Sequence, residues 1–127
     1  VYPVTAEAAC AGVDTLIEQL RLQVSTSTRE PAVCLVETDP KRLSESGSDE
    51  NHLDRIAYVG DGNFFGHGRF RITAAVRPTS DGNARLRLTT RVEGFDAGYR
   101  NLRSTGLIER AAFDRLEEIL GVAHLDP

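Results

Sequence analysis

Arginines occupy alternate positions in two neighbouring segments of this chain, residues 69–77 and 83–92. Five of them define the pattern: Arg69, Arg71, Arg85, Arg87 and Arg91. Because successive side chains of a β-strand point to opposite faces, these guanidinium groups are expected to share one face of a sheet. Such a face is suited to an anionic partner, which would be nucleic acid, anionic lipid headgroups or an acidic protein surface.

A solvated sheet face is the plainer interpretation of the same arginines, and we favour it. Acidic residues of the polar segment 39–54 would then neutralise part of the positive charge. Sheets that bind RNA usually carry stacking aromatic side chains, whereas the exposed positions of these two segments alternate arginine and threonine. Nucleic acid is therefore not the expected partner. A module that binds anionic ligands or nucleic acid through these arginines remains the alternative hypothesis.

The glycine-rich segment 60–68 resembles a phosphate-binding loop at first sight. Loops of that kind bind phosphate where they lead into the N-terminus of a helix, and this segment leads into a strand pattern without a following Gly-Lys-Ser or Gly-Lys-Thr. We expect its glycines to permit a bulge or turn while Phe64 or Phe65 packs at the sheet edge. No cofactor is predicted here.

The histidines His52, His67 and His124 are scattered along the chain, and no two share a spacing that would converge on a metal ion. No metal site is therefore predicted. An alternative hypothesis, a small enzyme that uses the loop around His67, requires a pocket beside that loop with a carboxylate or a second histidine.

Catalytic groups of other kinds are equally weak in the sequence. No Gly-x-Ser-x-Gly motif is present, and Cys34 lies in the middle of a predicted strand, where a nucleophile would be poorly exposed. The neighbouring carboxylates at 49–50 and at 117–118 have the pattern of solvated surface. The chain is therefore not expected to be an enzyme.

Two cysteines, Cys10 and Cys34, are too few for a disulfide scaffold and lack metal-ligand spacing. Both have apolar sequence neighbours, and free cysteine is often buried, so we expect two free thiols in the core. A single disulfide in an oxidising compartment is the alternative.

The arginine-bearing segments alternate polar and apolar residues with a period of two, which predicts a long β-hairpin with one apolar face. Its apolar side chains are Phe70, Ile72, Ala74, Val76, Ala84, Leu86, Leu88 and Val92. Apolar residues at helical spacing predict helices at about 6–21, capped by Thr5, and at about 105–120, capped by Ser104 or Thr105 and ended by Gly121.

Four further segments complete the predicted layout: an extended lead-in at 1–4, strands at 22–28 and 32–38, and a short strand at 55–59. Residues 39–54 are expected to form an exposed polar loop, and residues 99–103 an irregular connection. The order (β)-α-β-β-β-β-β-α predicts one α+β domain over residues 1–127. It would be a two-layer sandwich with an antiparallel sheet of about four to six strands and two helices on one face.

Composition agrees with one ordinary globular domain of 127 residues, with 40% hydrophobic residues and a net charge of −4. No apolar run approaches the ~20 residues that a membrane span requires. The chain does not begin with methionine, which fits a mature chain whose targeting segment has been removed, and fits an excised domain equally well.

The segment Arg103-Ser-Thr-Gly-Leu-Ile-Glu109 resembles the Ser-Thr-Gly-x-x-Glu pattern that begins the final helix in small bacterial envelope lipoproteins. The N-terminal Tyr-Pro-Val strand, the helix over 6–20 and the following Leu-Gln-Val are similar too. The layout resembles the repeated domains of BamC (NlpB)-type outer-membrane lipoproteins and related uncharacterised lipoproteins. This resemblance implies a helix-grip or TATA-binding-protein-like fold.

The same resemblance implies a non-enzymatic, periplasm-facing domain with an accessory or scaffolding role in an envelope assembly. Its partners would be other envelope proteins, and it would meet the outer membrane only through a lipid anchor outside this chain. The lipobox cysteine of such an anchor is absent here, and Cys10, within a predicted helix, does not supply it.

Overall fold

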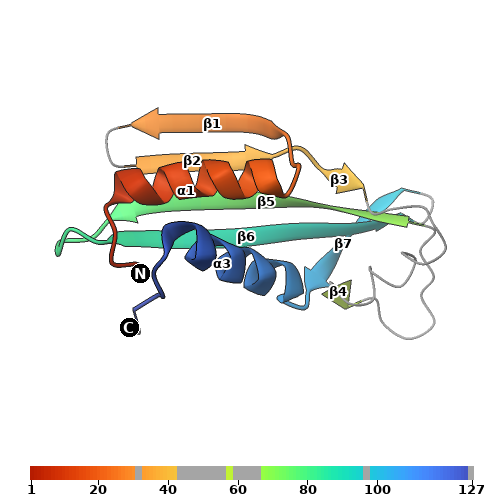
Figure 1. Ribbon diagram of the computed structural model, residues 1–127. Helices are drawn as coiled ribbons and strands as arrows, with labels where there is room; N and C mark the ends of the chain where they lie inside the picture. Colours follow the sequence, from red (N-terminus) through yellow and green to blue (C-terminus); the bar gives the residue numbers. More distant parts are fainter. Residues whose placement is uncertain (31–32, 43–56, 59–66, 96–97, 126–127) are drawn as a thin grey trace.

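The computed structural model describes residues 1–30, 33–42, 57–58, 67–95 and 98–125. Its helices are α1 (Ala6–Gln19) and α3 (Leu107–Leu120). Its strands are β1 (Val24–Glu30), β2 (Val33–Thr38), β3 (Lys41–Arg42), β4 (Ala57–Tyr58), β5 (His67–Pro78), β6 (Ala84–Phe95) and β7 (Tyr99–Ser104). Figure 1 shows both helices lying along one face of a sheet whose longest strands are β5 and β6.

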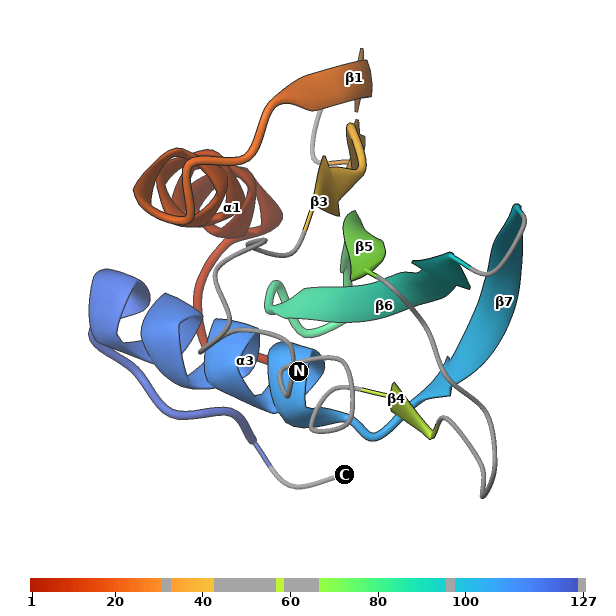
Figure 2. The same ribbon diagram turned by 90° about the vertical axis from the view of Figure 1, so that its right-hand side faces the viewer.

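The strands pair antiparallel in the order β1-β2-β5-β6-β7-β4, and β3 pairs with β5 beside β2. Seen end-on, α1 and α3 occupy one side of the strongly twisted sheet, and no helix of the described residues covers the other side (Figure 2). The predicted α+β composition and the order of elements are confirmed. We call the uncovered side the helix-free face.

The β5–β6 hairpin is the centre of the fold and pairs in unbroken register from His67 opposite Phe95 to Pro78 opposite Ala84. Its period-two pattern places the predicted apolar side chains toward the helices, where most of them are buried. The turn between the strands is closed by Thr79, whose N–H donates to the Asn83 carbonyl at 2.9 Å. The sequence pattern therefore predicted the central hairpin correctly.

Helix α1 begins as predicted at Thr5, whose hydroxyl accepts a hydrogen bond from the Ala8 N–H at 3.1 Å. Its apolar stripe, which includes Val13 and Leu16, is buried against the sheet and α3. Gly12 lies where α1 meets α3, because an added Cβ there would come within 2.7 Å of Leu120 Cδ2. The glycine therefore permits the close approach of the two helices.

Cys10 of α1 and Cys34 of β2 form a disulfide, with their Cα atoms 6.2 Å apart. The expectation of two free thiols is therefore wrong. Both cysteines are buried between α1 and the sheet, as their apolar sequence neighbours suggested. Because they face one another across this layer, their sulfur atoms are close enough to bond. The bond ties the helical layer to the sheet.

Strands β2 and β3 run along the same partner and are separated by Asp39 and Pro40. At this break the backbone N–H of Ile72 donates to the buried hydroxyl of Thr38 at 2.9 Å. The threonine side chain thus replaces a backbone acceptor that the interrupted strand does not offer.

Two predicted details at the C-terminal end are wrong. Residues Tyr99–Ser104 form strand β7 rather than an irregular connection, because they pair antiparallel with the last residues of β6. The N-cap of α3 is Gly106, with φ of +88°, rather than Ser104 or Thr105. The Ser104 hydroxyl instead accepts from the Gly106 N–H at 3.1 Å and donates to the Glu109 carboxylate.

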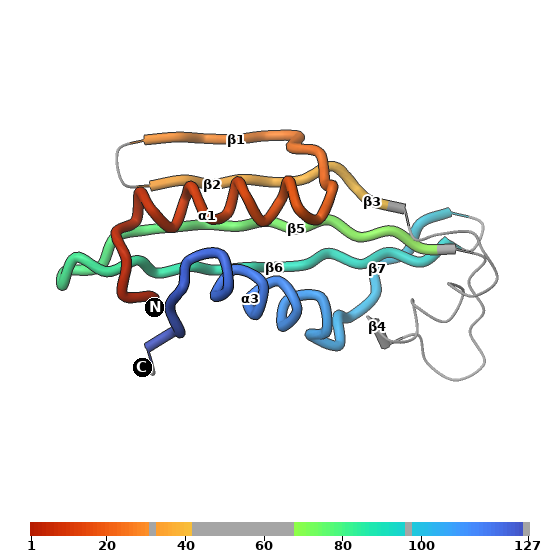
Figure 3. The backbone as a smooth tube through the Cα atoms, viewed as in Figure 1, coloured from red at the N-terminus to blue at the C-terminus, as the bar shows by residue number. Residues whose placement is uncertain are grey.

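The chain ends lie close together at the turn end of the β5–β6 hairpin (Figure 3). The predicted N-terminal lead-in is a single bridge, in which Tyr2 exchanges backbone hydrogen bonds with Ala84. The C-terminal tail returns to it, since the Leu125 N–H donates to the Val1 carbonyl at 2.7 Å. The predicted strand at 55–59 is described only as β4, and most of the predicted 39–54 loop lies outside the described residues.

Candidate functional site

The helix-free face carries all five arginines singled out by the sequence, but they do not form one uniform patch. Register in the β5–β6 hairpin places Arg71 opposite Arg91, Arg87 opposite Ala75 and Arg85 opposite Arg77. Arg69 stands opposite Glu93. The face divides into an end near the β5–β6 turn, a middle, and an end near β7, and each has its own chemistry.

At the β7 end, Arg69 Nε donates to Glu93 Oε1 at 3.0 Å, and its guanidinium carbon lies 3.5 Å from the ring centre of Tyr99. Tyr99 also meets Phe95 edge to face, with ring centres 5.2 Å apart. Both rings remain 37% exposed. We call Arg69, Glu93, Phe95 and Tyr99 the aromatic end of the helix-free face.

In the middle of the face, two arginines are held by polar neighbours. Arg71 Nη1 lies 3.1 Å from Glu37 Oε1, and Arg91 Nε donates to the Asn101 side chain at 3.1 Å. Arg71 is also partly buried, and its Nε has no hydrogen-bond partner among the described residues. These two guanidinium groups are therefore fixed in place by the sheet.

Near the turn, Arg77, Arg85 and Arg87 surround Ala75 and line a hollow of about 240 Å³. All three arginines are exposed. In the described part of the chain, no carboxylate lies within salt-bridge distance of them. We call these four residues the arginine hollow.

One expectation about the arginine face stays a prediction and another needs correction. The described carboxylates that contact this face, Glu37 and Glu93, come from strands β2 and β6, and residues 43–54 lie outside the described ranges, so neutralisation by the acidic loop stays a prediction. Exposed aromatic side chains are also present on this face, at Phe95 and Tyr99. The sequence pattern did not indicate these two aromatic side chains, because both lie outside segments 69–77 and 83–92 and because β7 was not predicted as a strand.

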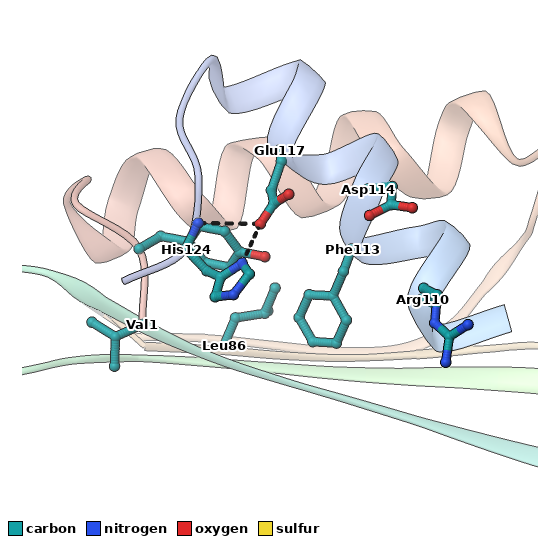
Figure 4. Close-up of a pocket in the computed structure, with 8 residues that line it drawn as sticks. Val1, Leu86, Arg110, Phe113, Asp114, Glu117 and His124 are labelled. Carbon is teal, nitrogen blue, oxygen red and sulfur yellow. Dashed lines mark hydrogen bonds and ion pairs between the residues drawn. The ribbon is translucent and has the colours of Figure 1, made fainter. Parts of the chain in front are cut away.

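A second candidate site, which we call the terminal pocket, opens between α3, the start of β6 and the two chain ends (Figure 4). Its volume is about 440 Å³. Leu86, Phe113 and Val1 supply apolar surface, and the charged side chains around them are Arg110, Asp114, Glu117 and His124. Tyr2 completes the lining.

Two of the charged groups of the terminal pocket, Glu117 and His124, contact one another directly. Glu117 Oε1 lies 2.7 Å from His124 Nδ1 and accepts the His124 backbone N–H at 3.1 Å, and these hydrogen bonds lower the pKa of the Glu117 carboxyl. The Tyr2 ring is buried and packs edge to face against the His124 ring. Burial, followed by the negative charge of Glu117, raises the pKa of Tyr2 to about 12.

The pairing of Glu117 with His124 corrects the expectation that the carboxylates at 117–118 are simply solvated. Gly121, with φ of +71°, reverses the chain after α3 and returns the tail along the helix. In the sequence, a glycine that ends the helix followed three residues later by histidine was the signal that could have predicted this contact. Glu118, by contrast, lies 3.2 Å from Arg115 on the exposed side of the helix.

The terminal pocket holds acid–base groups, but none of its eight lining residues is serine, threonine or cysteine. The combination of charged groups and apolar surface is suited to binding a small molecule with polar and apolar parts. Among the residues that the structure describes, no three His, Cys, Asp or Glu side chains converge as metal ligands.

The site around the glycine-rich segment stays untested. Residues 60–66 and His52 lie outside the described residues, and so do the predicted positions of Phe64 and Phe65. His67 is described only as the first residue of β5. The hypothesis of an enzyme that uses the His67 loop therefore remains a hypothesis.

Comparisons with known proteins give no match to a family model, a curated protein or a solved structure. The resemblance to envelope lipoproteins thus stays a prediction from layout and one motif. Within the described residues, no helix has the length and apolar character to cross a membrane.

Proposed function

We propose that this chain is a non-enzymatic, periplasm-facing domain of a bacterial lipoprotein, with an accessory or scaffolding role in an envelope assembly. It would join that assembly through protein–protein contacts made by the aromatic end of its helix-free face. The observation that carries the proposal is the stacked pair of Arg69 and Tyr99 beside exposed Phe95.

Residues of these types suit a protein interface. Tyrosine and arginine are enriched among the residues that dominate binding energy at interfaces, and aromatic residues are enriched at interface cores. Here Arg69 is held by its ion pair with Glu93 and by the Tyr99 ring, over which its guanidinium lies. A partner would therefore meet side chains that are already ordered, which lowers the entropic cost of binding.

The compartment is supported by chemistry independent of the face. The Cys10–Cys34 disulfide is the kind of bond that persists in oxidising compartments such as the bacterial periplasm and is rare in the cytosol. The α+β layout and the Ser-Thr-Gly-x-x-Glu segment support the lipoprotein class.

The proposal is tested by expressing the complete natural gene, tagged, in its own bacterium and extracting the envelope with mild detergent. We expect the protein in the membrane fraction within a complex larger than the single chain. The double variant Arg69→Ala/Tyr99→Ala should release it from that complex, while Arg115→Ala, an exposed arginine of α3, should not. A cytoplasmic protein, or a complex unaffected by the double variant, would refute the proposal.

A further inference from the structure

The arginine hollow lies at the opposite end of the helix-free face from the aromatic end. Arg77 and Arg85 are direct cross-strand partners, and Arg87 stands across from Ala75. The short side chain of Ala75 forms the bottom of the hollow, and the three longer arginine side chains form its walls. Two paired strands fix all four positions relative to one another.

The hollow gathers three arginines at one place on the helix-free face. Like charges directly opposite one another in a sheet destabilise it. Elsewhere on the same face, Arg69 and Arg71 each have a carboxylate within 3.1 Å. The three arginines of the hollow have none in the described residues, so their mutual repulsion is not relieved within the described fold.

We propose that the arginine hollow is a binding site for a phosphate group. Each guanidinium presents a planar fork of N–H donors that matches two oxygens of a phosphate, and several such forks around one hollow surround a tetrahedral anion. Its volume of about 240 Å³ accommodates such a group. Binding would replace repulsion among three cations with three charge-assisted contacts.

The residues beside the hollow indicate which kind of molecule would carry the phosphate group. Leu35 of β2 stands opposite Ala75 and is 46% exposed, which places apolar surface beside the arginines. Aromatic side chains suited to stacking bases lie instead at the other end of the face. These surroundings favour free phosphate or a phosphate-bearing lipid headgroup over nucleic acid. The inference stands on different residues from the proposed function and does not depend on it.

The test uses the intact, disulfide-bonded chain and two probes at constant ionic strength. Inorganic phosphate, titrated against a chloride control, should shift the arginine Nε–H NMR signals of Arg77, Arg85 and Arg87 and leave that of Arg69 unchanged. Vesicles of phosphatidylcholine with and without phosphatidylglycerol then separate the sources. Sedimentation with the anionic vesicles alone identifies a lipid headgroup, and phosphate shifts without sedimentation identify a free phosphate.

The variant Arg77→Gln/Arg85→Gln/Arg87→Gln should weaken binding of the effective probe by about tenfold or more, as expected from losing charge-assisted hydrogen bonds. The matched control Arg21→Gln/Arg29→Gln/Arg115→Gln removes the same charge from exposed positions outside both the helix-free face and the terminal pocket and should bind like the wild type. Because the first variant removes like-charge repulsion, it should melt no lower than the wild type.

Three results would overturn the inference. The first is the absence of binding to both probes. The second is binding that both triple variants weaken equally, which would indicate a response to net charge. The third is an oligonucleotide that binds through these three arginines while phosphate and vesicles do not.

Discussion

Individual side chains of the same type have different environments in this protein. Arg69 and Arg71 each contact a carboxylate, while Arg77 and Arg85 face one another across two strands. Alternation along the sequence predicts which face an arginine occupies, because it depends only on strand geometry. Which neighbour it meets depends on strand register and on distant strands, so the division of the face required the structure.

At the residue scale, Tyr2 should titrate later than an ordinary tyrosine. Its pKa is about 12 in the folded protein and close to 10 in an unfolded chain. The folded state therefore holds this proton more tightly. The contribution of Tyr2 to the free energy of unfolding is complete below pH 10 and is lost as the pH rises toward 12. Absorbance at the tyrosinate band should show a late step that Tyr2→Phe removes. A late step that survives this substitution would contradict the assignment.

The Glu117 carboxyl should make stability depend on acid. Its pKa is lower in the folded protein than in the unfolded chain because it accepts hydrogen bonds from His124. Its contribution is therefore complete above its unfolded pKa and lost as the pH falls through its folded pKa. Thermal melts from pH 6 downward should show a smaller acid-induced decrease for Glu117→Gln than for wild type.

Glu118→Gln is the matched control for that experiment, because the neighbouring carboxylate is 70% exposed and contacts only Arg115 in the described structure. It should behave like the wild type. Equal effects of the two substitutions would mean that Glu117 has no special role.

At the element scale, the long periodic segments were predictable and the short ones were not. Strands β5 and β6 alternate over most of their twelve residues, and α1 and α3 have apolar stripes that fix their faces. Strand β7 has six residues and no buried side chain, so no apolar alternation marks it. Its formation depends on pairing with β6, which local sequence does not encode.

The crossing of α1 and α3 should be sensitive to the size of residue 12. Gly12→Val would place new atoms against Leu116 and Leu120, at a cost of about 1–3 kcal/mol. Ala11→Val on the exposed side of α1 carries the same β-branched side chain and serves as the control. Denaturant unfolding should show the larger loss for Gly12→Val, and equal losses would exclude a tight crossing.

At the scale of the whole molecule, the two layers are joined covalently as well as by the core. The Cys10–Cys34 bond closes a loop with a sequence separation of 24 residues. The sequence favoured two free thiols, because cysteines in apolar segments are often buried and unpaired, and a disulfide was only the alternative. Their juxtaposition depends on how α1 packs on β2, which only the assembled fold determines.

Reduction of this disulfide should lower the free energy of unfolding by about 3 kcal/mol, because the unfolded chain regains the entropy of an open loop. The measurement is denaturant unfolding with and without reductant. Cys10→Ala/Cys34→Ala should be insensitive to reductant and about as stable as the reduced wild type. If the wild type were also insensitive to reductant, the bond would not be part of the native protein.

The central claim is that the helix-free face, rather than the helical layer, contacts an envelope partner. A photo-crosslinking amino acid at Asn101, on the exposed surface of β7 beside the aromatic end, tests it most directly in living cells of the native bacterium. The same probe at Ala111, exposed on α3, is the control. We predict one discrete adduct with an envelope protein at residue 101, lost in Arg69→Ala/Tyr99→Ala, and none at residue 111. An adduct at residue 111 alone, or at neither position, would contradict the claim.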